Sequence, residues 1–170
     1  MKTILILAMH GSPPNDFPKR ELGEFFALHA RFETAPTSMD EASRSRYAEL
    51  DQKMRRWPRT AENDPFHAAS LSLAHLLSRE SGLETRVCFN EFCAPTLEEG
   101  VEQAVKDGFE RVIVVTPMMT RGGEHAEVEI PAQIQQLQSE YPDLHLIYAW
   151  PFEEREIARF LAAQVRRFLE

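Results

Sequence analysis

Two uninterrupted hydrophobic runs of strand length constrain the fold of this chain more than any other feature. Residues 4–9 read ILILAM and residues 112–115 read VIVV, with no polar side chain in either run. Such runs are typical of strands whose two faces are both covered, as in a parallel sheet with helices on either side. We therefore expect both runs to be central strands of a parallel sheet.

Two other stretches have the character of outer strands. Residues 85–90 read TRVCFN, and their alternation with a period of two indicates a strand with one less buried face. This strand is expected at an edge of the sheet. The run over residues 144–150, which stops before Pro151, completes a set of four strands.

Each interval between these strands carries hydrophobic residues at helical spacing. Asp64 followed by Pro65 is typical of a helix start, and Gly82 and Gly108 stand where two helices are expected to end. Strands and helices therefore alternate, which predicts an α/β fold with a doubly wound sheet of four parallel strands. With the first and third strands central, the expected order is the flavodoxin-like 2-1-3-4. The residues that define the helices are Phe66, Ala69, Leu73 and Leu77; Leu97, Val101, Ala104 and Val105; Ala126, Ile130, Ile134 and Leu137; and Ile157, Phe160, Leu161, Val165 and Phe168.

Residues 14–63 form a longer connection than a crossover needs. One amphipathic helix is expected around Phe25, and a second one opens with a capping box at residues 38–41 and carries Tyr47. We expect this helical insertion to pack beside or over the mouth of the sheet. Its aromatic stripe either docks on the core, the interpretation that we favour, or covers a substrate. Because no segment is repeated, residues 1–170 are predicted to form a single domain.

Charge and cysteine content exclude several classes of protein. The chain has 19 Lys and Arg against 27 Asp and Glu, a net charge of −8, which argues against nucleic acid as a partner. Its longest hydrophobic run, six residues, is far shorter than the roughly 20 needed to cross a membrane. Cys88 and Cys93 form neither a disulfide framework nor a CxxC pair. We therefore expect a cytoplasmic protein with no membrane partner, in which Cys88 is a reduced core thiol.

Polar side chains follow three of the four predicted strands. His10 comes directly after the first strand, Glu91 after the second and His125 after the third. In open α/β sheets, ligands bind beyond the carboxyl ends of the strands. Two histidines and one carboxylate around an open position are a recurrent site for a catalytic or transiently held divalent metal. Each residue alone is a weak signal, because a single histidine at a strand end is more often a packing residue than a ligand.

Two acidic residues and four other histidines have less defined roles. Glu127 and Glu129 follow His125, and they either add carboxylates to the site or are first-turn acidic residues favoured by the helix dipole. The other histidines lie within helices or a strand, without a partner at ligand spacing. We interpret them as structural or solvated; they are His29, His67, His75 and His145.

The motifs at these strand ends resemble those of a known family. They are HGS at residues 10–12, FNEF at 89–92, PTLE at 95–98 and VIVVTPMMTRGGEHAEVEIP at 112–131. In this order they are similar to the small class II tetrapyrrole chelatases, above all to the sirohydrochlorin cobaltochelatase and ferrochelatase family of cobalamin and siroheme synthesis. The resemblance covers residues 1–12 and about 83–170. The chain departs from the family pattern at residues 118–121 (MMTR), at Glu129, where Asp is frequent, and in the inserted segment.

This resemblance implies a metal chelatase, a lyase that inserts Co(II) or Fe(II) into sirohydrochlorin or a related acidic tetrapyrrole. The metal is then a substrate, no cofactor is tightly bound, and the same three residues hold the metal and carry the catalysis: His10, Glu91 and His125. Substrate contacts are expected from residues beside them, which are Ser12, Arg121, Gly122 and Gly123. Because the chain is net acidic, attraction for a polycarboxylate must be local. Arg121, Lys19 and Arg20 are the candidates, although they fit solvated surface charge equally well.

The larger chelatases of this kind resemble two such domains in one chain, whereas this chain has one set of motifs. We therefore expect a homodimer in which a symmetric partner closes the cleft, unless the insertion supplies that wall. Two other classes stay open. One is a metal-binding or metal-delivery protein without chelatase activity, and the other is a flavodoxin-like binding domain whose histidines are incidental.

Overall fold

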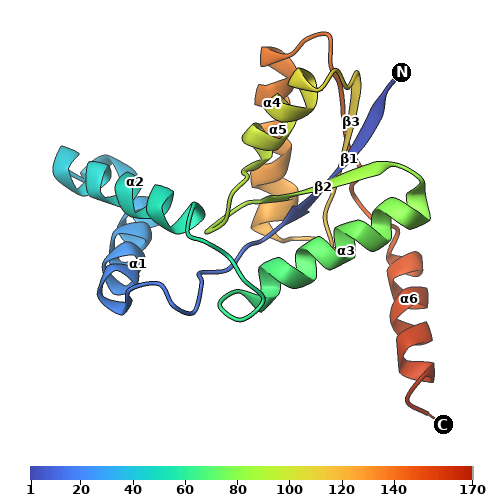
Figure 1. Cartoon of the computed structure of the whole chain (residues 1–170), viewed down its shortest axis with the longest axis horizontal. Helices are drawn as coiled ribbons and strands as arrows, with labels where there is room; N and C mark the ends of the chain where they lie inside the picture. Colours follow the sequence, from blue (N-terminus) through green and yellow to red (C-terminus); the bar gives the residue numbers. More distant parts are fainter. Residues whose placement is uncertain (170) are drawn as a thin grey trace.

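The computed structural model describes residues 1–169, with the side chain of Pro36 left out. Its centre is a sheet of four parallel strands in the order β2-β1-β3-β4 (Figure 1), which confirms the predicted fold class and strand order. The strands are β1 (Thr3–Met9), β2 (Glu84–Phe89), β3 (Arg111–Val115) and β4 (His145–Tyr148).

The two uninterrupted hydrophobic runs form the central strands, as predicted. Leu7 of β1 pairs with Val87 on one side and with Val115 on the other. Every residue from 4 to 9 is buried, because both faces of β1 are covered. The prediction of double coverage holds only in part for β3, in which Ile113 and Val115 are half-buried while their neighbours are buried.

Helices form a layer on each face of the sheet. Helices α4 (Leu97–Lys106) and α5 (Ile130–Glu140) pack on the face of the sheet to which β1 contributes Ile4. Helix α3 (Pro65–Ser81) packs on the opposite face, to which β1 contributes Leu7. As predicted, the Asp64 side chain caps α3 by accepting the His67 N–H, with Pro65 at the first helical position. The sheet lies between these two helical layers, as predicted for a doubly wound α/β fold.

The segment between β1 and α3 contains two helices that pack on each other and stand apart from the sheet, at the left of Figure 1. They are α1 (Lys19–Thr34) and α2 (Glu41–Arg55), joined by the short 3-10 helix η1 (Pro36–Ser38), and we call them the hairpin. The predicted capping box at residues 38–41 is wrong, although a helix does begin there. The N-cap of α2 is Asp40, whose side chain accepts the Ser43 N–H, because Ser38 belongs to η1.

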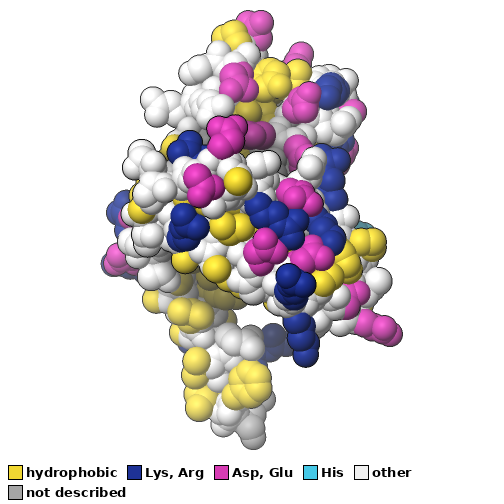
Figure 2. All heavy atoms as spheres, turned by 90° about the vertical axis from the view of Figure 1, so that its left-hand side faces the viewer, with side chains coloured by type: hydrophobic (Ala, Val, Ile, Leu, Met, Phe, Trp, Pro, Cys, Tyr) yellow, Lys and Arg dark blue, Asp and Glu magenta, His cyan; other side chains and the backbone are white. Residues whose placement is uncertain are grey.

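The last helix, α6 (Glu154–Arg166), has the predicted amphipathic pattern but lies away from the sheet, and none of its residues is buried. Hydrophobic side chains gather on this projecting part at the bottom of Figure 2, whereas acidic and basic side chains are interspersed on the face above it. Among residues 1–169, no helix combines the length and hydropathy needed to span a membrane.

Candidate metal site

The ends of β1 and β2 bring His10 and Glu91 side by side. The strand pairing continues past the two strands, because the Asn90 N–H donates to the Met9 carbonyl and the Glu91 N–H donates to the His10 carbonyl, each at 2.9 Å. Gly11 makes this approach feasible. It has a φ of +102°, and a Cβ atom there would lie 1.9 Å from the Glu91 carbonyl oxygen, so a side chain has no room.

His125 reaches the same edge of the sheet from the loop after β3. It begins a π-helical turn, η2 (His125–Glu129), which runs directly into α5. The sequence predicted an ordinary helix here, and the wider turn is a difference from that prediction. Single π turns of this kind are frequent at functional sites.

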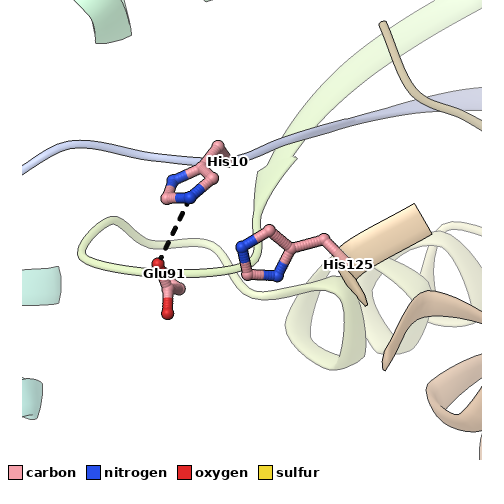
Figure 3. Close-up of side chains that lie close together, drawn as sticks. All are labelled: His10, Glu91 and His125. Atoms are coloured by element: carbon pink, nitrogen blue, oxygen red, sulfur yellow. Dashed lines mark ion pairs between the residues drawn. The ribbon is translucent and has the colours of Figure 1, made fainter. Parts of the chain in front are cut away.

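Together these loops place three candidate ligands around one position, as Figure 3 shows. His10, Glu91 and His125 each offer one ligand atom within 4.8 Å of the other two. The Nε2 atom of His10 lies 3.5 Å from Oε2 of Glu91, and the two imidazole rings are perpendicular with centroids 4.6 Å apart. The side chains are partly exposed, so an ion from solvent can reach them. Small rotations suffice to bring nitrogen and oxygen ligands to the roughly 2.0–2.2 Å of a bound divalent metal.

The second ring nitrogen of each histidine is already engaged. His10 Nδ1 lies 3.0 Å from the Gly11 carbonyl oxygen, and His125 Nδ1 lies 2.6 Å from Oε2 of Glu129. Because both partners are acceptors, they favour the tautomer with the proton on Nδ1 and leave the Nε2 lone pair for a metal. In the structure Glu129 therefore orients His125, which the sequence had left undecided.

Glu127 has a different environment from Glu129. Its carboxylate accepts hydrogen bonds from Arg121 Nε and from the Gly122 N–H, each at 3.0 Å. The Arg121 hydrogen bond, followed by that of Gly122, lowers the pKa of Glu127. The carboxylate thus fastens the loop before His125, where Gly123 also lies and accepts the Glu127 N–H.

The predicted substrate-contact residues line the loops on either side of the three ligand candidates. Ser12 follows His10 and is half-buried, with its hydroxyl group directed to the Pro13 carbonyl oxygen. Arg121 is exposed but paired with Glu127, while Lys19 and Arg20 are exposed in the first turn of α1.

Sequence reasoning missed His29. This residue of α1 was interpreted as structural or solvated, and it is indeed outside the ligand cluster, but the interpretation gave no sign that its Nε2 lies 3.8 Å from Oε1 of Glu91. Its Nδ1 lies 3.0 Å from the hydroxyl oxygen of Tyr47 in α2. Spacing along a helix gives no signal for such a contact, since the partner lies on another element.

Arg59 was also missed, and it connects the hairpin to both loops of the site. Its guanidinium group donates to the carbonyl oxygens of Ser12, Met54 and Phe92, and it forms a 2.5 Å ion pair with Asp64. Both members of the pair are buried, at 7% and 0% side-chain exposure. One side chain thus fixes the loop after His10, the loop after Glu91, the end of α2 and the start of α3.

Among solved structures, a cobalamin (vitamin B12) biosynthesis CbiX protein from Marinobacter aquaeolei VT8 matches with 18% identity and a TM-score of 0.46, over 100% of both chains. The sirohydrochlorin chelatase SirB from Bacillus subtilis subspecies spizizenii, in complex with cobalt, matches with 21% identity and a TM-score of 0.44. That match covers 89% of this chain and 44% of SirB.

Two curated relatives come from Priestia megaterium. A sirohydrochlorin ferrochelatase is 36% identical over 66 residues, and a sirohydrochlorin cobaltochelatase is 29% identical over 79 residues. The matches cover 39% and 46% of this chain, but only 24% and 26% of the relatives, so the chain covers about a quarter of their length. The family model CbiX matches residues 62–167, which is more than half of the chain. The chain therefore belongs to the CbiX family.

Proposed function

We propose that this protein is a metal chelatase that inserts Co(II) or Fe(II) into sirohydrochlorin or a related acidic tetrapyrrole, in cobalamin or siroheme synthesis. The observation that carries the proposal is the convergence of His10, Glu91 and His125 at the carboxyl edge of the sheet. The names of the relatives in Priestia megaterium support the choice of reaction and substrate.

The three side chains have the chemistry that metal insertion needs. The reaction transfers a divalent ion to the macrocycle nitrogens while two pyrrole N–H protons leave. Imidazole and carboxylate groups suit such an ion, and each group that releases it regains a lone pair able to accept a proton. His10, His125 and Glu91 are thus ligands at the start of transfer and bases at its end, and the two protons then pass to solvent.

The hairpin offers an aromatic edge for a flat macrocycle. The ring of Phe92 lies 6.1 Å from that of His10 and 6.1 Å from that of Phe26. Phe26 keeps 43% of its surface exposed, unlike the buried Phe25 beside it. Under this proposal residues 1–170 are one chelatase-like domain, in which the insertion over residues 14–63 forms one wall of the cleft.

The proposal assigns contacts with the substrate to four residues around the metal position. Ser12 and the backbone of Gly122 and Gly123 supply hydrogen-bonding groups to the carboxylate side chains of the tetrapyrrole. Arg121 supplies a positive charge; in the structure its guanidinium group forms an ion pair with Glu127.

We also propose a homodimer, in which α6 of each copy packs on the half-covered face of the other sheet. Three large side chains of α6, Phe160, Leu161 and Val165, each expose more than half of their surface, and Ile113 and Val115 remain half-buried on β3. Two such helices and the sheet faces that receive them would form an apolar, self-complementary interface between the copies. Light scattering at micromolar concentration checks the mass, and a monomer contradicts the dimer.

The cytoplasm is the proposed location. Cys88 and Cys93 are both free and buried, as is usual in a reducing compartment. Burial raises the pKa of the Cys88 thiol to about 12, so it is an inert core group.

The proposed activity is tested by incubating the purified protein anaerobically with sirohydrochlorin and Co(II), Fe(II) or Ni(II), and by following the absorption spectrum. Metal-dependent conversion of the sirohydrochlorin spectrum, faster than without protein, is the expected result. Tight metal binding without spectral conversion would instead indicate a metal-delivery protein. If neither occurs, the histidines are incidental and the proposal is wrong.

A further inference from the structure

Two polar side chains of the hairpin reach the metal site: Arg55 donates to the carbonyl oxygens of Asn90 and Cys93 in the loop that carries Glu91, and His29 faces the Glu91 carboxylate itself. The carboxylate of Glu91 lies between two imidazoles, with Oε2 3.5 Å from His10 Nε2 and Oε1 3.8 Å from His29 Nε2. Glu91 and His29 each expose 23% of their side chains, so their attraction is only partly screened by water. His29 itself is outside the set of side chains whose ligand atoms lie within 4.8 Å of one another.

Packing within the hairpin fixes the orientation of the His29 ring. The ring stacks on Phe25 at 5.6 Å and on Tyr47 at 5.9 Å, and its Nδ1 lies 3.0 Å from the Tyr47 hydroxyl oxygen. Burial raises the pKa of Tyr47 to about 12, so the hydroxyl group stays protonated and can donate a hydrogen bond to His29 Nδ1. In that tautomer the remaining N–H of His29 is on Nε2, the atom that faces Glu91.

We propose that His29, oriented by Tyr47, is a positioning residue that holds Oε1 of Glu91 and thereby turns Oε2 toward the metal position between His10 and His125. A terminal carboxylate rotates easily, because its last torsion has no sharp minima. A polar N–H held 3.8 Å from one oxygen restricts this freedom by electrostatic attraction, although the distance is longer than a hydrogen bond. Partners that orient a metal ligand in this way typically contribute ten- to hundredfold in metal affinity.

This inference rests on the metal site of the proposed function but not on the tetrapyrrole reaction, so metal binding alone tests it. The matched variants separate positioning from packing. His29→Phe keeps a ring against Phe25 and Tyr47 and removes the N–H, whereas His29→Gln restores an N–H donor. Tyr47→Phe keeps the stacking and removes only the hydroxyl group, and Tyr141→Phe is a control outside the site.

Calorimetric titration of the full chain with CoCl₂ under anaerobic conditions is the experiment, with the visible Co(II) spectrum recorded for each variant. His29→Phe is expected to weaken Co(II) binding about ten- to hundredfold and to shift the Co(II) bands, while His29→Gln recovers part of the loss. Tyr47→Phe is expected to produce a smaller loss, and Tyr141→Phe none.

A double-variant cycle makes the inference specific to Glu91. In a Glu91→Ala background, His29→Phe should cost little further affinity, because the side chain that it positions is gone. Wild-type affinity in His29→Phe, or an equal loss with and without the Glu91 carboxylate, would overturn the inference. Since neither result involves sirohydrochlorin, the proposed activity can stand or fall separately.

Discussion

The sheet and the hairpin approach the same metal position by different means. All three candidate ligands follow strands of the sheet, where parallel topology brings distant segments to one edge. The hairpin contributes His29, which contacts a ligand and not the metal position, and it is joined to the sheet loops by the buried Arg59. If the proposals above hold, the sheet edge supplies the metal ligands, whereas the hairpin positions one of them.

The largest effect is expected from the ligands of the sheet edge. His10→Ala and His125→Ala should each abolish metal insertion, because neither side chain supports the core and each supplies one of the three metal-binding groups. The rate of sirohydrochlorin metallation measures the loss, and thermal unfolding checks that the fold is kept. His145→Ala, an exposed histidine on β4, is the matched control. If the His125→Ala protein metallates sirohydrochlorin at the parental rate, His125 is not a ligand for the transferred metal, and the contrast between sheet edge and hairpin fails.

The second-largest effect is expected from Arg59, which links the hairpin to the sheet. Arg59→Met should destabilise the protein by about 3–5 kcal/mol, since it leaves the Asp64 carboxylate buried without its partner. Arg56→Met is the control, because Arg56 and Glu99 form an exposed pair expected to contribute less than about 1 kcal/mol. Urea unfolding measures both free energies. Similar losses in the two variants would mean that Arg59 does not bind the hairpin to the sheet.

A smaller effect is expected from the carboxylate that orients His125. Glu129→Ala should reduce Co(II) affinity about ten- to hundredfold, because the imidazole loses the partner that fixes its tautomer and direction. Glu127→Ala removes a carboxylate of the same turn that contacts Arg121 and Gly122 instead of His125, so it should reduce the affinity less than Glu129→Ala does. Calorimetric titration with Co(II) compares the two. If Glu127→Ala has the larger effect, the roles given to these carboxylates are reversed.

The smallest expected effect concerns the loop before His125. The Arg121 hydrogen bond lowers the pKa of Glu127, so the ionised carboxylate is favoured in the folded protein. Its contribution to loop stability is present above the pKa of the unfolded chain and is lost as pH falls through the lower, folded value. Arg121→Gln should raise the pKa of Glu127 toward the ordinary glutamate range in a carboxyl NMR titration. The pKa of Asp107, which Arg86 lowers, is the internal control and should not move.

Much of the sheet could be predicted from the sequence because its signals are local. Hydrophobic runs identify the central strands, and the loops that follow the strands lie at the edge where ligands bind. His10, Glu91 and His125 were found in this way, and the structure places them together. Their roles as metal ligands and bases stay a prediction.

The parts that could not be predicted depend on contacts between distant segments. Nothing in the spacing of His29 indicates that α1 will carry it to Glu91, and a lone Arg59 in a connecting segment gives no sign of three carbonyl partners. The periodicity of α6 correctly predicts a helix with one apolar face, but periodicity does not say what covers that face.

The most direct test of the account is X-ray absorption spectroscopy of Co(II) bound to the full protein, before and after sirohydrochlorin is added anaerobically. Before addition, the account predicts a shell with two imidazole nitrogens and one carboxylate at about 2.0–2.2 Å. After addition, the imidazole signals should give way to the four nitrogens of the macrocycle. A shell of oxygens without imidazole, or an imidazole shell that sirohydrochlorin leaves unchanged, would contradict the claim that these three residues hold a metal and transfer it.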